Sequence, residues 1–277
     1  MSRILPIHEE KLTFFTESKE WSTFWRNTIQ GLHDSNRRFT YNNNITRVIA
    51  AYPNSHIIYG SEFRNPDILQ HLLKDSPFWP EVNNSLRKGA KYPLERISNK
   101  KRKLDLEDAI IRGNHKSAKI EIPTLKNLVN KDVKAAFQLP VPIETVRNTP
   151  HACIAPYGLA HQNTINELGE IIDKYRITHD QSFKFSSKTS VNDRVKREEL
   201  LELIYGDAFR RIIHYIHSLR TRYPHKCILI GKYDFKSAYR RLTMWGHSAA
   251  ASCTYIDGIA YISLRLTFGG APCPFLW

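Results

Sequence analysis

Two adjacent residues, Asp257 and Gly258, constrain the fold of this chain more than any other feature. They alone separate two runs rich in β-branched and aromatic residues, SCTYI (252–256) and IAYISLRL (259–266). A two-residue Asp-Gly link between β-prone runs is the strongest short hairpin signal in a sequence, because both positions of the tight turn need residues that tolerate positive φ angles. The sequence therefore predicts a β-hairpin here.

The segment before the hairpin is expected to form a long helix over residues 195–222. Asn192 or Asp193 would cap its start, and Pro224 would end it. Apolar residues recur close to the 3.6-residue helical period, which indicates one buried face. That face comprises Leu201, Ile204, Ala208, Ile212, Tyr215, Ile216 and Leu219.

A strand and a short helical turn are expected between this helix and the hairpin. The run CILIGKYDF (227–235) has three apolar residues together, as a fully buried strand requires. A helical turn is expected after Ser237.

The chain divides near residue 140. Residues 1–140 are expected to form a basic, mostly helical region, with one helix at DILQHLL (67–73) that ends at the FWP of 78–80. The basic run NKKRK (99–103) is either a solvated surface loop or a patch for phosphate contact or nuclear import. Prolines at 140, 142, 150 and 156 forbid a continuous helix after that region. Residues 141–277 then form the second region.

The charge balance favours a polyanionic partner. Lysine and arginine number 41 against 27 aspartates and glutamates, a formal net charge of +14. Such a field attracts nucleic acid first and anionic membrane surfaces second. The four cysteines form no CxxC pair, which argues against a zinc site or a disulfide framework and favours a reducing compartment. No apolar run reaches the roughly 18 residues of a membrane span. We therefore expect an intracellular protein, nuclear or cytoplasmic, that does not associate with a membrane.

Asp234 is the acidic residue with the most unusual setting. It ends an apolar run, where a lone acid is expensive to bury without a partner, and Lys232 and Lys236 flank it. The residue either caps the short helix that follows or presents a metal-binding carboxylate at a strand end. This spacing alone leaves both possibilities open.

Four segments in a fixed order resemble motifs of reverse transcriptases. KYDFKSAYRR (232–241) is similar to the palm strand whose aspartate binds the catalytic metals, and LTFGGAPCP (266–274) is similar to the family's Leu-Pro-Phe-Gly-x-x-x-x-Pro loop. DKYRITHDQSF (173–183) and TSVND (189–193) resemble the fingers hairpin of retroelement enzymes. The resemblance covers about residues 140–277, and Thr267 stands where proline is common. It implies an α+β fold: a mostly helical N-terminal region, then the fingers and a partial palm of a right-hand polymerase.

The resemblance also implies roles for individual residues. Asp234 would be the catalytic carboxylate that binds the first metal ion, and the backbone carbonyl of Phe235 would face a metal beside the nucleotide. Tyr239 would clash with a ribose 2′-hydroxyl and so select deoxynucleotides. The remaining positions that match nucleotide-binding residues are Lys174 and Arg176, which would grip the triphosphate, and Phe268 and Gly269 in the loop, which Pro274 closes.

Elementary chemistry agrees with these roles. In-line phosphoryl transfer uses two Mg²⁺ ions, which prefer carboxylate oxygens. An arginine at 176 can offer a bidentate fork to phosphate. The Gly269–Gly270 step would let the backbone approach a base pair with no Cβ in the way. The partners implied are an RNA template, a DNA primer and deoxynucleoside triphosphates.

One element of the family pattern is absent from the printed sequence. Two metal ions need a second source of carboxylate, in the family an aromatic-x-Asp-Asp hairpin, and the sequence contains no Asp-Asp pair up to Trp277. We therefore expect a fragment of a reverse transcriptase that does not polymerise DNA by itself. The alternative is a non-catalytic, basic nucleic-acid-binding remnant or domesticated fragment in which Asp234 is a relic. An unrelated basic enzyme with a chance motif match is a third possibility.

Overall fold

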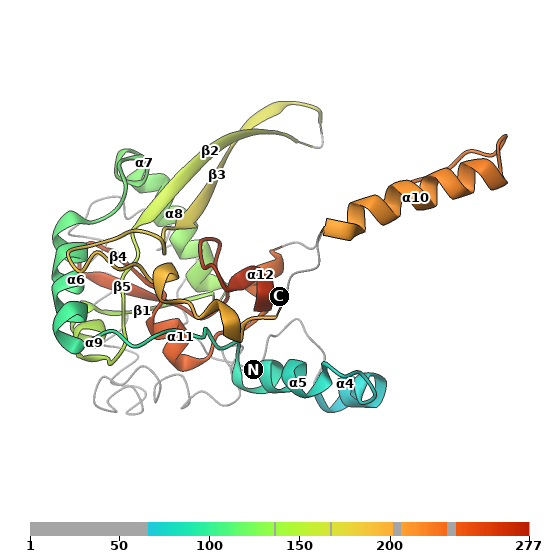
Figure 1. The fold of residues 1–277 in the computed structure, drawn as a ribbon. Helices are drawn as coiled ribbons and strands as arrows, with labels where there is room; N and C mark the ends of the chain where they lie inside the picture. The colour runs from blue at the N-terminus through green and yellow to red at the C-terminus, as the bar shows by residue number, and fades with distance from the viewer. Residues whose placement is uncertain (1–65, 136, 167, 202–205, 232–236, 277) are drawn as a thin grey trace.

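The computed structural model describes residues 66–276 except 136, 167, 202–205 and 232–236, and all structural statements here concern those residues (Figure 1). Within them the chain has a mixed α+β architecture, with nine α-helices and two small antiparallel sheets. None of the helices in this part of the chain is long and apolar enough to cross a bilayer.

The predicted hairpin is confirmed. Strands β4 (Cys253–Ile256) and β5 (Ile259–Ser263) pair antiparallel, and the two residues between them have positive φ angles, 48° at Asp257 and 88° at Gly258. Strand β1 (Gln138–Pro142) pairs with the other side of β5, which gives the strand order β1-β5-β4. The two prolines of β1 are tolerated because it is an edge strand, where a missing N–H faces no partner.

Five helices precede β1: α4 (Pro66–Leu73), α5 (Trp79–Lys88), α6 (Asn99–Arg112), α7 (Lys116–Ile120) and α8 (Ile122–Lys134). The helix expected at 67–73 is confirmed as α4. The FWP of 78–80 does not end it but begins α5, because proline in the first turn lacks an N–H that would have no partner there.

The basic run at 99–103 is helical, so the loop interpretation was wrong. These residues form the first turns of α6, where the Ser98 side chain accepts a hydrogen bond from the Lys101 backbone N–H. The guanidinium of Arg102 is buried and donates to Asn99 and to the carbonyl of Arg147. A phosphate-contacting role for the exposed lysines of this run stays a prediction.

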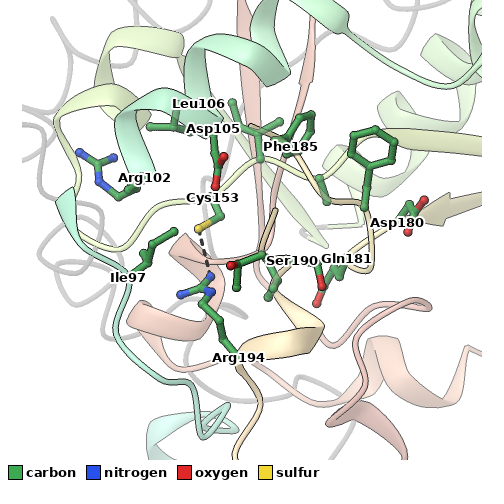
Figure 2. Close-up of a pocket in the computed structure, with 15 residues that line it drawn as sticks. Ile97, Arg102, Asp105, Leu106, Cys153, Asp180, Gln181, Phe185, Ser190 and Arg194 are labelled. Atoms are coloured by element: carbon green, nitrogen blue, oxygen red, sulfur yellow. Dashed lines mark hydrogen bonds between the residues drawn. The ribbon is translucent and has the colours of Figure 1, made fainter. Parts of the chain in front are cut away.

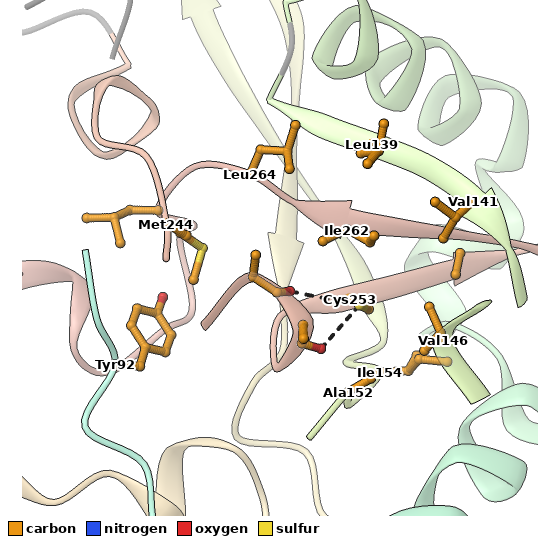
Figure 3. Close-up of a cluster of buried hydrophobic side chains, with 14 of the residues drawn as sticks. Tyr92, Leu139, Val141, Val146, Ala152, Ile154, Met244, Cys253, Ile262 and Leu264 are labelled. Carbon is orange, nitrogen blue, oxygen red and sulfur yellow. Dashed lines mark hydrogen bonds between the residues drawn. The ribbon is translucent and has the colours of Figure 1, made fainter. Parts of the chain in front are cut away.

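The main hydrophobic core joins residues from both sides of position 140. Leu106 of α6 belongs to the same buried cluster as Tyr92, Val141, Ile262 and Leu264. Figure 3 shows the last four of these side chains. Helix α9 (Ile143–Asn148) follows β1 and also contributes to this cluster. The expected boundary at 140 therefore falls within a strand whose neighbours on both sides of the sequence share one core.

A second hairpin extends away from this core (Figure 1). Strands β2 (Tyr157–Ile165) and β3 (Ile171–His179) pair antiparallel, from Tyr157 opposite His179 to Ile165 opposite Ile171. The end of the hairpin formed by Tyr157 and His179 is buried. Tyr157 packs in a second cluster with Leu125 and Val129 of α8. The far end is exposed, so one end of the hairpin is fixed by the core and the other is open to solvent.

The long helix and the strand after it differ from expectation. Two 3₁₀ helices, η2 (Asn192–Arg194) and η3 (Arg197–Glu199), lie where the helix was expected to start, and α10 spans Gly206–Arg222. No side chain from 207 to 222 is buried, and α10 projects from the body in Figure 1. Residues 227–231 form no strand, and Leu229 is 88% exposed, so the buried strand was wrong for them. Residues 232–235 lie outside the described residues.

The remaining elements follow in order. The helical turn expected after Ser237 is confirmed as the 3₁₀ helix η4 (Ala238–Arg241). Helix α11 (Gly246–Ala250) precedes the β4–β5 hairpin, and α12 (Cys273–Leu276) follows the Gly/Pro loop.

Candidate functional site

The segments that resemble four polymerase motifs lie against one another in the fold. They are the end of β3, the irregular segment 180–193, the turn η4 and the Gly/Pro loop at 267–274. Only residues 237–241 of the motif that contains Asp234 are described. The contacts between these segments, given next, form the candidate site.

Tyr239 and Phe268 are in direct contact. Their ring centroids are 5.0 Å apart, and the rings meet edge to face at 62°. Tyr239 is half-buried, whereas Phe268 is 55% exposed. Two residues expected to face the nucleotide thus form one aromatic pair with an open face.

Gly269 packs against the end of β3. Its φ angle is +119°, and a Cβ at this position would lie 1.8 Å from the carbonyl oxygen of His179. The His179 backbone N–H donates to the carbonyl of Phe268 at 3.3 Å. A Cβ on Gly270 would lie 2.4 Å from the hydroxyl of Tyr92. Both glycines therefore make close contacts with groups of the protein itself, and the expected approach to a base pair stays a prediction.

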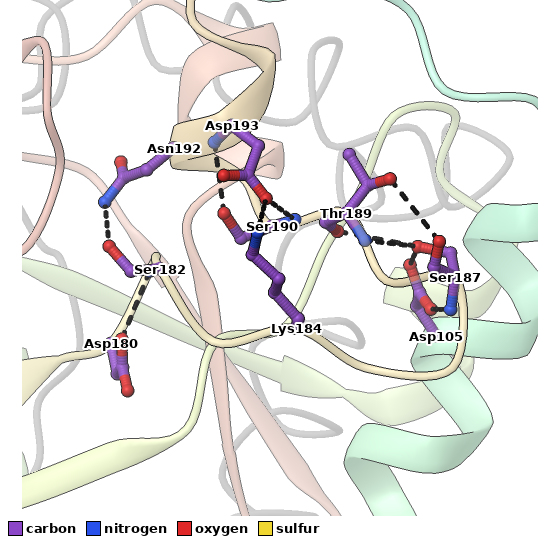
Figure 4. A network of polar contacts seen from close by, with 9 residues as sticks. All are labelled: Asp105, Asp180, Ser182, Lys184, Ser187, Thr189, Ser190, Asn192 and Asp193. Atoms are coloured by element: carbon purple, nitrogen blue, oxygen red, sulfur yellow. Dashed lines mark hydrogen bonds and ion pairs between the residues drawn. The ribbon is translucent and has the colours of Figure 1, made fainter.

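The side chain of Asn192 holds the Gly/Pro loop in place. Its Nδ2 donates to the carbonyl of Gly269 at 2.7 Å and to the Ser182 hydroxyl at 2.8 Å, and its Oδ1 accepts the Ala271 N–H at 2.8 Å. Figure 4 shows Asn192 beside Ser182. Asn192 was not among the predicted site residues, although the resemblance of its segment to a polymerase motif was a signal.

Gln181 adds a buried link below this loop. Its Nε2 donates to the hydroxyls of Thr267 at 3.0 Å and Ser252 at 3.2 Å, and its backbone carbonyl accepts the Asn192 backbone N–H at 3.0 Å. The departure from proline at position 267 thus supplies a hydrogen-bond acceptor. Nothing in the spacing of the sequence indicated this role for Gln181.

Reciprocal hydrogen bonds fix the segment 184–193 (Figure 4). Asp193 accepts the Ser190 N–H at 2.9 Å and pairs with Lys184 at 3.0 Å, while its own N–H donates to the Ser190 hydroxyl. The Ser190 N–H and Lys184 hold the pKa of the Asp193 carboxyl below its usual value. Asp193 is therefore an anchor of this segment and not the cap of a long helix.

Lys174 and Arg176 lie on one exposed face of β3. Alternation along a strand places Tyr175 and Ile177 on the other face, where they pack on the second core cluster. Arg176 precedes His179 by three residues, about 10 Å along a strand. Neither basic side chain forms an ion pair within the described ranges, so both are available to an anion.

Asp234 and Phe235 lie outside the described residues, so the expected catalytic carboxylate and the metal-facing carbonyl are not placed. Elsewhere in the described part of the chain, no three His, Cys, Asp or Glu side chains gather in a way that could hold a metal ion. The Mg²⁺ site stays a prediction.

A pocket lies beside this site, between α6 and the segment 180–194 (Figure 2). Leu106 and Phe185 give it apolar walls, and Arg194 donates to the Cys153 sulfur at 3.2 Å. Burial raises the pKa of the Cys153 thiol even though Arg194 opposes that shift. A neutral thiol is a poor nucleophile, so the raised pKa argues against Cys153 as a nucleophile.

No protein-family model, no curated protein and no solved structure matches this chain. The motif resemblance and the geometry of the site are therefore the observations that bear on function.

Proposed function

We propose that this chain is the nucleotide-facing part of a retroelement reverse transcriptase, comprising its fingers and an incomplete palm. The parent activity would be RNA-directed DNA synthesis inside the cell, with Mg²⁺, an RNA template, a DNA primer and deoxynucleoside triphosphates. One observation carries the proposal: segments that resemble separate motifs of that family meet around the pair of Tyr239 and Phe268.

The geometry suits the parts of a nucleotide. Arg176 and Lys174 project from an exposed strand face and can neutralise a triphosphate. The open face of Phe268 can stack on a base, because base–aromatic stacking tolerates any base identity. Tyr239, beside it, would meet the sugar and disfavour a 2′-hydroxyl.

Catalysis would need groups beyond those placed here. Asp234 would hold Mg²⁺ in the parent enzyme, and bound Mg²⁺ would supply activation of the primer 3′-oxygen and charge stabilisation of the pyrophosphate. One carboxylate cannot balance two divalent ions, and the sequence contains no Asp-Asp pair. We therefore expect the chain alone to bind nucleotide and nucleic acid without incorporating nucleotide.

The test is photo-cross-linking of 4-thiothymidine triphosphate to the full chain, with Mg²⁺ and a poly(rA)–oligo(dT) duplex. We expect Arg176→Ala to lower labelling about tenfold, because a charge-assisted hydrogen bond to phosphate is lost. Phe268→Ala should also lower labelling, through lost stacking. Matched controls are Arg210→Ala on exposed α10 and Phe78→Ala, since Phe78 is 60% exposed and far along the chain from the loop.

Two outcomes would contradict the proposal. Equal labelling of Arg176→Ala, Phe268→Ala and their controls would show that the site does not receive the nucleotide. Duplex binding that weakens steeply with salt, with no nucleotide labelling at all, would favour the non-catalytic remnant, whose binding depends on the +14 charge alone.

A further inference from the structure

Arg240 follows Tyr239 directly in η4 and is nearly buried, with 9% of its surface exposed. Its guanidinium contacts two other elements through one nitrogen atom. Nη2 lies 2.8 Å from the Asp132 carboxylate on α8 and 3.3 Å from Nε2 of His179 at the end of β3. The guanidinium also lies over the Phe137 ring, 5.7 Å from its centroid. One side chain thus connects η4, α8 and β3.

Together with the Tyr239–Phe268 contact, these contacts form a closed cycle of interactions. Arg240 is bonded through the backbone to Tyr239 and contacts His179, the His179 N–H donates to the carbonyl of Phe268, and Phe268 returns to Tyr239 through their ring contact. Such a closed cycle of interactions fixes the Tyr239–Phe268 distance more firmly than any single contact could. Because His179 is the last residue of β3, the same cycle also sets the position of Arg176 on that strand.

The charges around Arg240 are compatible with this role. Asp132 supplies the opposite charge, and Arg240 opposes the upward shift that burial gives the pKa of that carboxyl. Burial and the neighbouring Arg240 hold the pKa of His179 well below its usual value. A neutral His179 can accept a hydrogen bond from the guanidinium instead of repelling it.

We propose that Arg240 is a positioning residue that holds Tyr239 against Phe268 and aligns both with Arg176. This inference rests on the proposed function, because the consequence we assign to it is discrimination between deoxy- and ribonucleoside triphosphates. Arg240 itself would touch neither the nucleotide nor the metal.

The test uses a double variant, Arg240→Met with Asp132→Leu, in the full chain. Removing both charges avoids leaving an unpaired carboxylate, which would unfold the site for an unrelated reason. The matched control is Arg147→Met with Glu107→Leu, another arginine–carboxylate pair, joined at 2.9 and 3.0 Å. Circular dichroism establishes that both variants are folded.

The first measurement is ¹⁹F NMR of 4-fluorophenylalanine placed at position 268, and it needs no ligand. The Tyr239→Leu variant gives the shift for a lost ring contact. We expect the ¹⁹F chemical shift of the Arg240 double variant to move toward that of Tyr239→Leu. The Arg147 control should keep the wild-type chemical shift. A wild-type shift in the folded Arg240 variant would overturn the positioning role.

The second measurement is the ratio of deoxy- to ribonucleotide cross-linking, with 4-thiothymidine and 4-thiouridine triphosphates. We expect the ratio to fall about tenfold in the Arg240 double variant, since a misplacement near 1 Å is enough for such losses. A changed ¹⁹F shift with an unchanged ratio would overturn the assigned role in selection and leave the proposed function standing. No labelling of wild-type protein would instead overturn the proposed function, while the ¹⁹F result still decides whether Arg240 holds the pair.

Discussion

Among the glycines of the described residues, Gly269 leaves the least room for an added side chain. Its φ of +119° disfavours any side chain, and a Cβ would collide with the carbonyl oxygen of His179. We expect Gly269→Ala to lower the free energy of unfolding by more than about 3 kcal/mol, because backbone strain and a steric clash add. Urea denaturation measures this loss.

Gly169 at the tip of the β2–β3 hairpin is the control for that substitution. Its φ is also positive, +81°, but an added Cβ would meet nothing within 4 Å. Gly169→Ala should therefore lower the free energy of unfolding by only about 1 kcal/mol, the contribution of backbone strain without a steric clash. Equal losses at the two glycines would show that the contact of Gly269 with His179 contributes nothing.

His179 makes stability depend on pH. Burial and then Arg240 hold its pKa well below 6.5, so it stays neutral in the folded protein while the unfolded chain takes up a proton. Stability is therefore full above pH 6.5 and falls as the pH drops through 6.5, by at most about 1.4 kcal/mol per pH unit for one such group. Burial lowers the pKa of His151 too, and that residue adds to the same trend.

The measurement is the urea midpoint of unfolding from pH 7.5 to 5.5. His179→Gln keeps an oxygen that can accept from Arg240 and removes the titration, so its midpoint should fall less steeply with pH than that of the wild type. A wild-type slope in His179→Gln would contradict the assignment.

At the scale of elements, the sequence predicts best where the information is local. The Asp257–Gly258 turn needs only its own two residues and the runs beside them, and it forms as expected. The helix of 66–73 and the turn at η4 are also local. The FWP of 78–80 shows where local information is not enough. A proline can follow the end of one helix or lie in the first turn of the next, and here it lies in the first turn of α5.

Elements whose burial depends on distant partners were predicted poorly. An apolar stripe indicates that a helix has a face to cover, yet Phe209, Ile212 and Tyr215 of α10 are all more than half exposed. The same holds for Leu229 and Ile230, whose run satisfies a strand pattern without pairing in the described residues. Periodicity carries no information on what supplies the covering surface.

The candidate site shows the same contrast between residues that local sequence identifies and residues whose role depends on distant partners. Motif resemblance selected Tyr239 and Phe268, which the fold brings into contact, and Lys174 and Arg176, which it leaves exposed nearby. It did not select the residues that hold the site together, such as Gln181. Their roles come from hydrogen bonds across long stretches of chain, and no spacing rule encodes those.

At the scale of the whole molecule, the shared core predicts one cooperative unit. Leu106 precedes position 140 and Ile262 follows it, yet both lie in the same buried cluster. We expect Leu106→Ala and Ile262→Ala each to lower the free energy of unfolding by about 2–5 kcal/mol and to shift the same single transition. Denaturation followed by both circular dichroism and tryptophan fluorescence tests this.

Two separate domains would give a different result. Each substitution would then move only one of two transitions, and the two optical probes would not coincide. That outcome would support the boundary near 140 as a division between independently folding units.

The pairing of β1 with β5 sets an order of events during synthesis. Gln138 pairs with Ser263, more than a hundred residues later, whereas Tyr157 of the β2–β3 hairpin pairs with His179 nearby in the chain. Pairings between distant segments close slowly, and nascent chains emerge from the N-terminal side. The β2–β3 hairpin can therefore form on the ribosome before β5 has been synthesised, while β1 is still unpaired. A nascent chain stalled before residue 259 would leave β1 unpaired, available to chaperones or to another copy of itself.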